Sequence, residues 1–155
     1  MKQLILKLTL PLTLISFAGF TKWWYVLVVD APDYVMYGFP FIYSCPAFHT
    51  SMAYQFFIME FFADILCYFS FWFLIIYAIS KKFPLRIKKA VSITLWIIAA
   101  LIITPPLGLH LLLGEDVYYF KRNFDIEVLE TGVAPIHSWK YMPRPYHKKY
   151  NPEGK

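Results

Sequence analysis

The sequence predicts an all-α integral membrane protein with three transmembrane helices and an extended, largely irregular C-terminal tail. Hydrophobic residues make up 59% of the 155 residues and charged residues only 16%, whereas about 25% are charged in a typical soluble domain. The apolar residues also form runs long enough to cross a bilayer, which takes about 20 residues. We therefore expect a transmembrane domain over residues 1–114, with spans at about 4–27, 52–80 and 90–114, and an extramembrane arm over 115–155.

The first apolar segment, from Leu4, admits two interpretations. Its basic start and the small side chains among residues 16–18 fit a cleaved secretory signal. Trp23 and Trp24 instead fit a retained helix that ends in an interfacial aromatic belt, and this is the interpretation we favour. Small or polar side chains recur at helical spacing and suit contact with a neighbouring helix; they are Thr9, Thr13 and Ser16.

Residues 30–51 are expected to form a loop, because three prolines and a glycine interrupt any helix there. The loop is rich in aromatic residues and contains no Lys or Arg, so we expect it over the membrane surface or against a partner. The connection 81–89 holds five basic residues and no acid. By the positive-inside rule this connection lies inside, which places the N-terminus inside and the tail outside.

The second span carries two carboxylates, Glu60 and Asp64, on one helical face with Cys67 and Ser70. An ionisable group within a span is costly and is by default a candidate functional site. His110 of the third span is expected to share the outer half of the membrane with these acids. These five residues are the predicted intramembrane polar or partner-binding site.

The third span is expected to break at Pro105 and Pro106. Each proline lacks an N–H, and the second one disfavours helical angles at the first. A broken helix at membrane depth persists only where protein or water satisfies the freed backbone groups.

Four roles remain open for the acids: pairing with a partner subunit, solvation at the interface, proton or cation conduction, and metal binding with His110 and His49. The sequence lacks the zinc-site spacings, and no base accompanies a Ser or Cys nucleophile. We thus predict no catalytic residue, no metal site and no cofactor, although bound lipid is expected. Cys45 and Cys67 lie too far apart along the chain for an expected disulfide.

The predicted function is that of a small accessory or assembly subunit of a larger membrane complex. Its contacts would be the polar face of the second helix, the 30–51 loop and the C-terminal arm. The alternative is an oligomeric proton- or cation-conducting element that uses Glu60 and Asp64. A third possibility is a membrane enzyme that uses a metal held by His110 and the acids, so enzymatic activity stays open. The location is a plasma, inner or organelle inner membrane.

The expected partners are other membrane subunits and the lipid bilayer. A nucleic-acid partner is not expected, because the basic residues cluster at helix ends and in the tail and no nucleic-acid-binding motif accompanies them. The sequence also predicts no small-molecule substrate.

Overall fold

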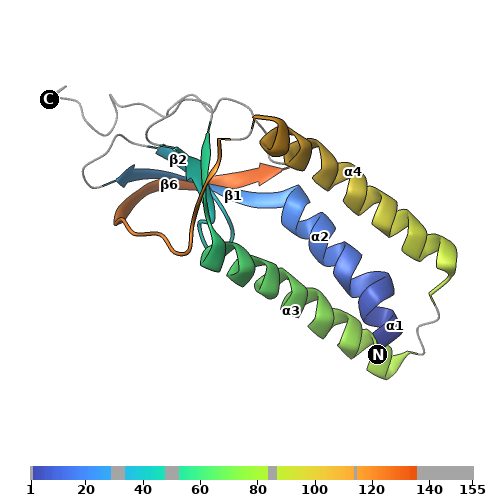
Figure 1. The fold of residues 1–155 in the computed structure, drawn as a ribbon. Coiled ribbons are helices and arrows are strands. Elements are labelled where there is room, and N and C mark those ends of the chain that lie inside the picture. Colours follow the sequence, from blue (N-terminus) through green and yellow to red (C-terminus); the bar gives the residue numbers. More distant parts are fainter. Residues whose placement is uncertain (1, 29–33, 48–52, 84–86, 114, 136–155) are drawn as a thin grey trace, which may run out of the picture.

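The computed structural model describes residues 2–28, 34–47, 53–83, 87–113 and 115–135. A group of helices extends from one end of a six-stranded sheet (Figure 1). The helical elements are α1 (Lys2–Leu4), the π-helical turn η1 (Ile5–Thr9), α2 (Leu10–Gly19), α3 (Ile58–Lys82) and α4 (Lys89–Leu113). The strands are β1 (Phe20–Val28), β2 (Tyr34–Tyr37), β3 (Ser44–Pro46), β4 (Tyr54–Phe57), β5 (Val117–Tyr119) and β6 (Ile126–Pro135).

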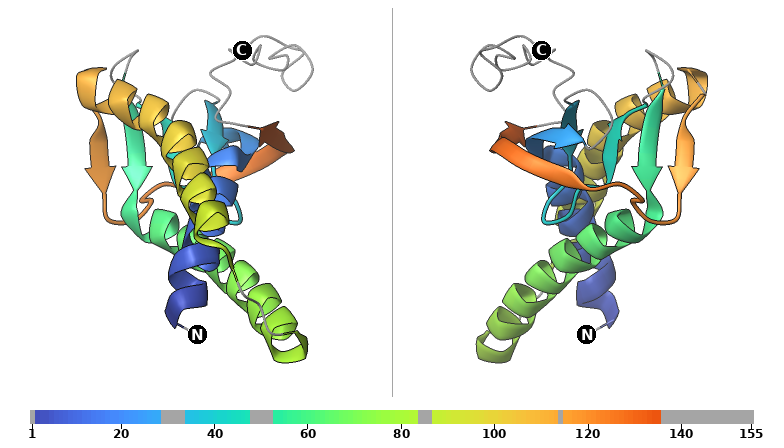
Figure 2. Two further views of the ribbon diagram at one scale, coloured as in Figure 1. Left: turned by 90° about the vertical axis from the view of Figure 1, so that its right-hand side faces the viewer. Right: turned by 90° about the vertical axis from the view of Figure 1, so that its left-hand side faces the viewer.

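The sheet has the strand order β5-β4-β3-β2-β1-β6 and is mixed, since β4 and β5 run parallel while the other neighbours are antiparallel. Figure 2 shows β4 and β5 at one side of the sheet and β1 and β6 at the other. The β1–β6 ladder is the longest, and its register shifts between Tyr25 and Val26. Two strands join helices without a linker: β1 follows α2 at Gly19–Phe20, and β4 precedes α3 at Phe57–Ile58.

The prediction of an all-α protein with three transmembrane helices is wrong, because strands of a mixed sheet form parts of four predicted segments, including β4 at the start of the predicted 52–80 span. The N-terminal helix ends at Gly19 rather than near residue 27, and β1 follows. The predicted 30–51 loop contains β2 and β3, and the predicted irregular tail contains β5 and β6. Residues 136–155 of that tail lie outside the described residues. The aromatic and β-branched residues of FTKWWYVLV suit a strand as well as an interfacial helix.

The predicted break at Pro105 and Pro106 is also wrong, since α4 continues through both prolines. Proline fixes φ near the helical value, so the helix can continue at the loss of the two hydrogen bonds that the missing N–H groups would make. The hydroxyl of Thr104 donates to the carbonyl of Ala100 at 2.6 Å in the same stretch.

The elements α1, η1 and α2 together form the N-terminal helix, which lies between α3 and α4 and contacts both (Figure 1). Thr9 and Thr13, two residues of the predicted small or polar stripe, are buried. The π-helical turn directs the N–H of Leu10 to the carbonyl of Ile5, and Pro11 has no N–H to give to the carbonyl of Leu6. The indole N–H of Trp96 on α4 donates to that carbonyl at 3.1 Å.

The sheet has an apolar core on one face, whereas α3 and α4 expose most of their apolar side chains. The core contains Val26, Val28, Met36, Ile42, Cys45 and Phe57. Among the described residues, two helices are long and apolar enough to cross a membrane, Ile58–Lys82 and Lys89–Leu112. Only 11% of the most apolar stretch of each is buried within the protein, so neither helix is the core of this fold.

Candidate functional site: the Asp64 loop and its apolar groove

Asp64 on α3 accepts hydrogen bonds from the connection between β2 and β3. We name this connection (residues 38–43) the Asp64 loop after the residue that it contacts. Its carboxylate is fully buried and accepts two backbone hydrogen bonds, each 2.8 Å long. Phe39 N–H donates to Oδ2, and Phe41 N–H donates to Oδ1. Hydrogen bonds to both oxygens stabilise the carboxylate where water is excluded, so the sequence-predicted site residue Asp64 has its polar contacts within its own chain.

Gly38 begins the Asp64 loop in a conformation that requires glycine. Its φ is +148°, and a Cβ there would collide with the backbone carbonyl of Phe41. The glycine N–H donates to the carbonyl of Lys22 at 3.0 Å, and its carbonyl accepts the indole N–H of Trp24 at 2.7 Å. The loop therefore joins β1 to α3 through backbone groups, and the Phe39–Pro40 peptide bond within it is cis.

Glu60 lies one turn before Asp64 and contacts a different segment. Its Oε1 accepts the backbone N–H of Arg122 at 3.3 Å, while its buried Oε2 has no hydrogen-bond partner among the described residues. The N–H of Met59 donates to the carbonyl of Phe120 at 3.0 Å. The start of α3 is thus held by the segment between β5 and β6, and the two acids serve separate contacts.

His110 pairs with an acid that follows it closely in the chain rather than with Glu60 or Asp64. Its Nδ1 lies 2.8 Å from Oδ2 of Asp116, and Oδ1 of Asp116 accepts the N–H of Tyr54 at 2.9 Å. The imidazole also packs edge-on against the rings of Tyr54 and Phe56. Burial, and secondly the charge of Asp116, raises the pKa of Tyr54. This cluster fixes the end of α4 to β4.

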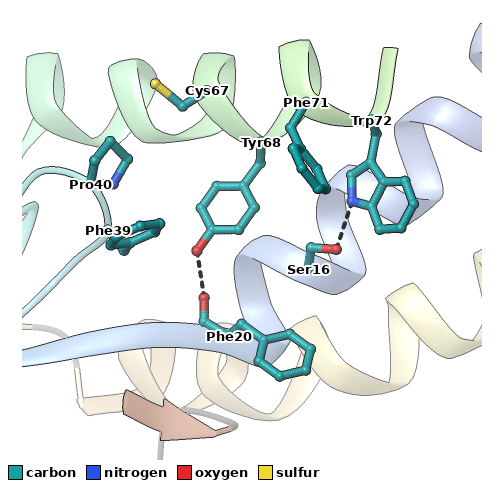
Figure 3. A pocket seen from close by; sticks show the side chains of 8 residues that line it. All are labelled: Ser16, Phe20, Phe39, Pro40, Cys67, Tyr68, Phe71 and Trp72. Atoms are coloured by element: carbon teal, nitrogen blue, oxygen red, sulfur yellow. Dashed lines mark hydrogen bonds between the residues drawn. The ribbon is translucent and has the colours of Figure 1, made fainter. Parts of the chain in front are cut away.

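An apolar groove of about 520 Å³ lies between α3, the end of α2 and the Asp64 loop (Figure 3). Its lining is almost entirely carbon. The lining residues are Ser16, Phe20, Phe39, Pro40, Cys67, Tyr68, Phe71 and Trp72. The indole N–H of Trp72 donates to Oγ of Ser16, and the hydroxyl of Tyr68 donates to the carbonyl of Phe20, both at 2.8 Å. These bonds tie α3 to the N-terminal helix and to β1.

The predicted polar face of the second helix divides into separate environments. Asp64 is buried, whereas Cys67 and Ser70 are exposed. Pro105 and Pro106 lie within α4 and interrupt no turn. Among the described residues, no three His, Cys, Asp or Glu side chains lie close enough to hold a metal ion. His49, which the sequence suggested as a further ligand, lies outside the described residues.

The groove is the feature that sequence reasoning missed. Tyr68 and Trp72 are four residues apart and so share a helical face, and Ser16 belongs to the predicted stripe of small residues. These signals predict contact between helices. The additional walls come from β1 and the Asp64 loop, and neither was expected beside α3.

Comparison of the chain with known protein families, with characterised proteins and with solved structures found no match.

Proposed function

We propose that this chain is a membrane-attached accessory subunit in which α3 and α4 lie in the bilayer and the sheet lies at its surface. The observation that carries the proposal is the exposure of large apolar side chains along both helices. Leu66 and Leu74 on α3 are each 63% exposed, and Leu101 on α4 is 68% exposed. Exposed apolar area of this extent is unfavourable in water and marks a membrane or protein contact.

The distribution of charge supports one orientation of the helices. Lys81 and Lys82 end α3, Lys88 and Lys89 lie at the start of α4, and the N-terminus lies at this same end of the helices (Figure 1). Basic residues favour the inner side of a membrane. The sheet would then lie on the outer side. From Asp64 to Lys81 the helix rises about 25 Å at roughly 1.5 Å per residue, close to the roughly 30 Å of a hydrocarbon core.

We place the contact with a partner protein at β6, which forms one edge of the sheet. Within the described ranges β6 pairs only with β1. Val128 and Val133 on this strand are 44% and 70% exposed. An edge strand offers unpaired backbone groups to a strand of another chain, and apolar side chains beside them would add contact area.

Ion conduction by Glu60 and Asp64 is not proposed. Both oxygens of Asp64 accept backbone N–H groups, and Glu60 contacts the separate segment that contains Arg122. Neither contact favours a conducting path over a structural role.

The test combines membrane extraction with site-specific photocrosslinking of the full chain in its native membrane. The chain should resist alkaline carbonate extraction. A photoreactive residue at Val133 should give a protein adduct of one discrete mass, whereas the same residue at Ile97, an exposed position on α4, should give lipid adducts. Release into the carbonate supernatant would overturn membrane attachment. A detergent-solubilised monomer without a protein adduct at Val133 would overturn the subunit role.

A further inference from the structure

The apolar groove beside Tyr68 has the composition of a site for a hydrocarbon chain. Its two polar side chains already take part in hydrogen bonds, Ser16 with Trp72 and Tyr68 with the carbonyl of Phe20. The rest of the lining is aromatic rings, Pro40 and Cys67 (Figure 3). Because none of the described lining residues carries a charge, a ligand there would be recognised through apolar contact.

The volume of the groove favours a hydrocarbon chain as the ligand over a helix of a partner protein. About 520 Å³ lies within the range of small-ligand sites, roughly 300–1,000 Å³. A helix about 10 Å across would fit for little more than one turn in that volume. A flexible chain of methylene groups can follow such a narrow space.

Lys22 on β1 is a basic residue close in the chain to the lining residue Phe20. It follows the lining residue Phe20 by two positions on β1, so both side chains project from the same face of the strand, about 7 Å apart. The carbonyl of Lys22 also accepts the N–H of Gly38, the residue before the lining residue Phe39. Its ammonium group lies 4.0 Å from the ring centre of Trp24. This contact does not neutralise the positive charge, so we expect the charge to attract a phosphate.

We propose that the groove binds one acyl chain of a phospholipid, with the phosphate of that lipid near Lys22. This inference rests on the proposed function, because a protein whose α3 lies in the bilayer meets phospholipid at this groove. The groove then sits beneath the outer surface, where the upper part of an acyl chain lies, and Lys22 sits at the level of the headgroups. The exposed ring of Phe71 makes the groove continuous with the lipid-facing side of α3.

The first experiment asks where a lipid chain contacts the protein. The full chain is reconstituted in phosphatidylcholine vesicles that contain a phospholipid with a diazirine in the upper third of one acyl chain, and adducts are mapped by mass spectrometry. We expect adducts concentrated on residues 67–72. Cys67→Trp, which adds an indole at a lining position, should lower this labelling about tenfold. Ser70→Trp is the matched control, since Ser70 is exposed on the same helix and does not line the groove.

The second experiment asks whether the phosphate matters. Native mass spectrometry in mild detergent should show one retained phospholipid for each chain, and less retention of diacylglycerol with the same acyl chains. Lys22→Gln should weaken phospholipid retention about fivefold, as expected for one lysine near a lipid surface, and leave diacylglycerol unchanged. Lys121→Gln, at an exposed residue outside the groove, should have no effect.

Three results decide the outcome. Labelling of Leu101 and Ile97 on α4 as strong as that of residues 67–72 would overturn the groove, while membrane attachment would stand. Equal retention of lipid by the wild type and Cys67→Trp, with both proteins folded by circular dichroism, would also overturn it. Release of the protein by carbonate would overturn the proposed function. The measurement of lipid retention in detergent would then still decide whether the groove binds an acyl chain.

Discussion

Trp23 and Gly132 lie directly opposite each other in β1 and β6, and the indole of Trp23 covers the glycine. A methyl group built on Gly132 would lie 2.5 Å from three atoms of that ring system. The space beside the glycine is therefore filled by the tryptophan, and the longest ladder of the sheet depends on a residue without a side chain at this position.

Gly132→Ala should destabilise the protein by about 1–3 kcal/mol, because the indole must move out of its place. In an ordinary strand the same substitution would be neutral or favourable, since glycine loses more entropy on folding. The measurement is denaturant unfolding in detergent micelles, with Thr131→Ala as the neighbouring control. An unchanged midpoint for Gly132→Ala would contradict the packing of Trp23.

Asp64→Asn should loosen the Asp64 loop. The two backbone N–H groups are aimed at different oxygens. Asparagine replaces one of these oxygens with an NH₂ group, which cannot accept a hydrogen bond, and each hydrogen bond to a charged group is worth about 1.5–3 kcal/mol. Amide hydrogen exchange should accelerate at Phe39 and Phe41, the two residues that donate to the carboxylate. Unfolding in detergent should show a stability loss of about 2 kcal/mol.

Glu60→Gln is the matched control for this loop. Its hydrogen bond to Arg122 is 3.3 Å long, and the amide oxygen of glutamine can still accept it. We expect a loss below about 1 kcal/mol and unchanged exchange at Phe39 and Phe41. Equal acceleration in both variants would show that the loop does not depend on Asp64.

Trp96→Phe should destabilise the contact between α4 and the N-terminal helix by about 1 kcal/mol, the usual value of a hydrogen bond. The loss should depend on Pro11. Pro11→Ala supplies a backbone N–H that can reach the carbonyl of Leu6, the acceptor of the indole N–H, so the same tryptophan substitution should then cost less. A double-mutant cycle measures this coupling, and strictly additive losses would argue against it.

Cys45 should make stability fall at alkaline pH. The thiol is buried in the sheet, and burial raises its pKa from 9.0 to about 12. Above pH 9 the unfolded chain releases this proton while the folded chain keeps it, so the unfolded state is favoured as the pH rises. Relative to Cys45→Ala, the wild type should lose up to about 1.4 kcal/mol for each pH unit between about 9 and 12. Parallel stability curves for the two proteins would contradict the retained proton.

The sequence predicts the long apolar helices better than the sheet, because the two depend on different kinds of contact. The residues of α3 and α4 form continuous apolar runs, a local property that hydropathy detects. A strand such as β1 is stabilised by partners far along the chain, including Gly132 opposite Trp23. Its aromatic residues suit an interfacial helix equally well, so the pattern alone favours neither.

The environment of the predicted site residues could be anticipated only in part. That Asp64 needs a partner follows from the cost of a buried carboxylate. That the partners are the backbone N–H groups of Phe39 and Phe41 does not follow, since every residue except proline carries one. His110 similarly pairs with Asp116, which comes just before β5, a contact that depends on how the helix ends.

The direct junctions at Gly19–Phe20 and Phe57–Ile58 leave no spacer that could absorb a rotation of α2 or α3. If the helix axes incline to match a thicker or thinner membrane, β1 and β4 must follow, because each is the covalent continuation of a helix. Two strands separate β4 from β1 in the sheet. Such a rotation would therefore shear the strands between them and alter the curvature of β6, which forms one edge of the sheet among the described residues. A change in bilayer thickness would thereby change the shape of the sheet at the membrane surface.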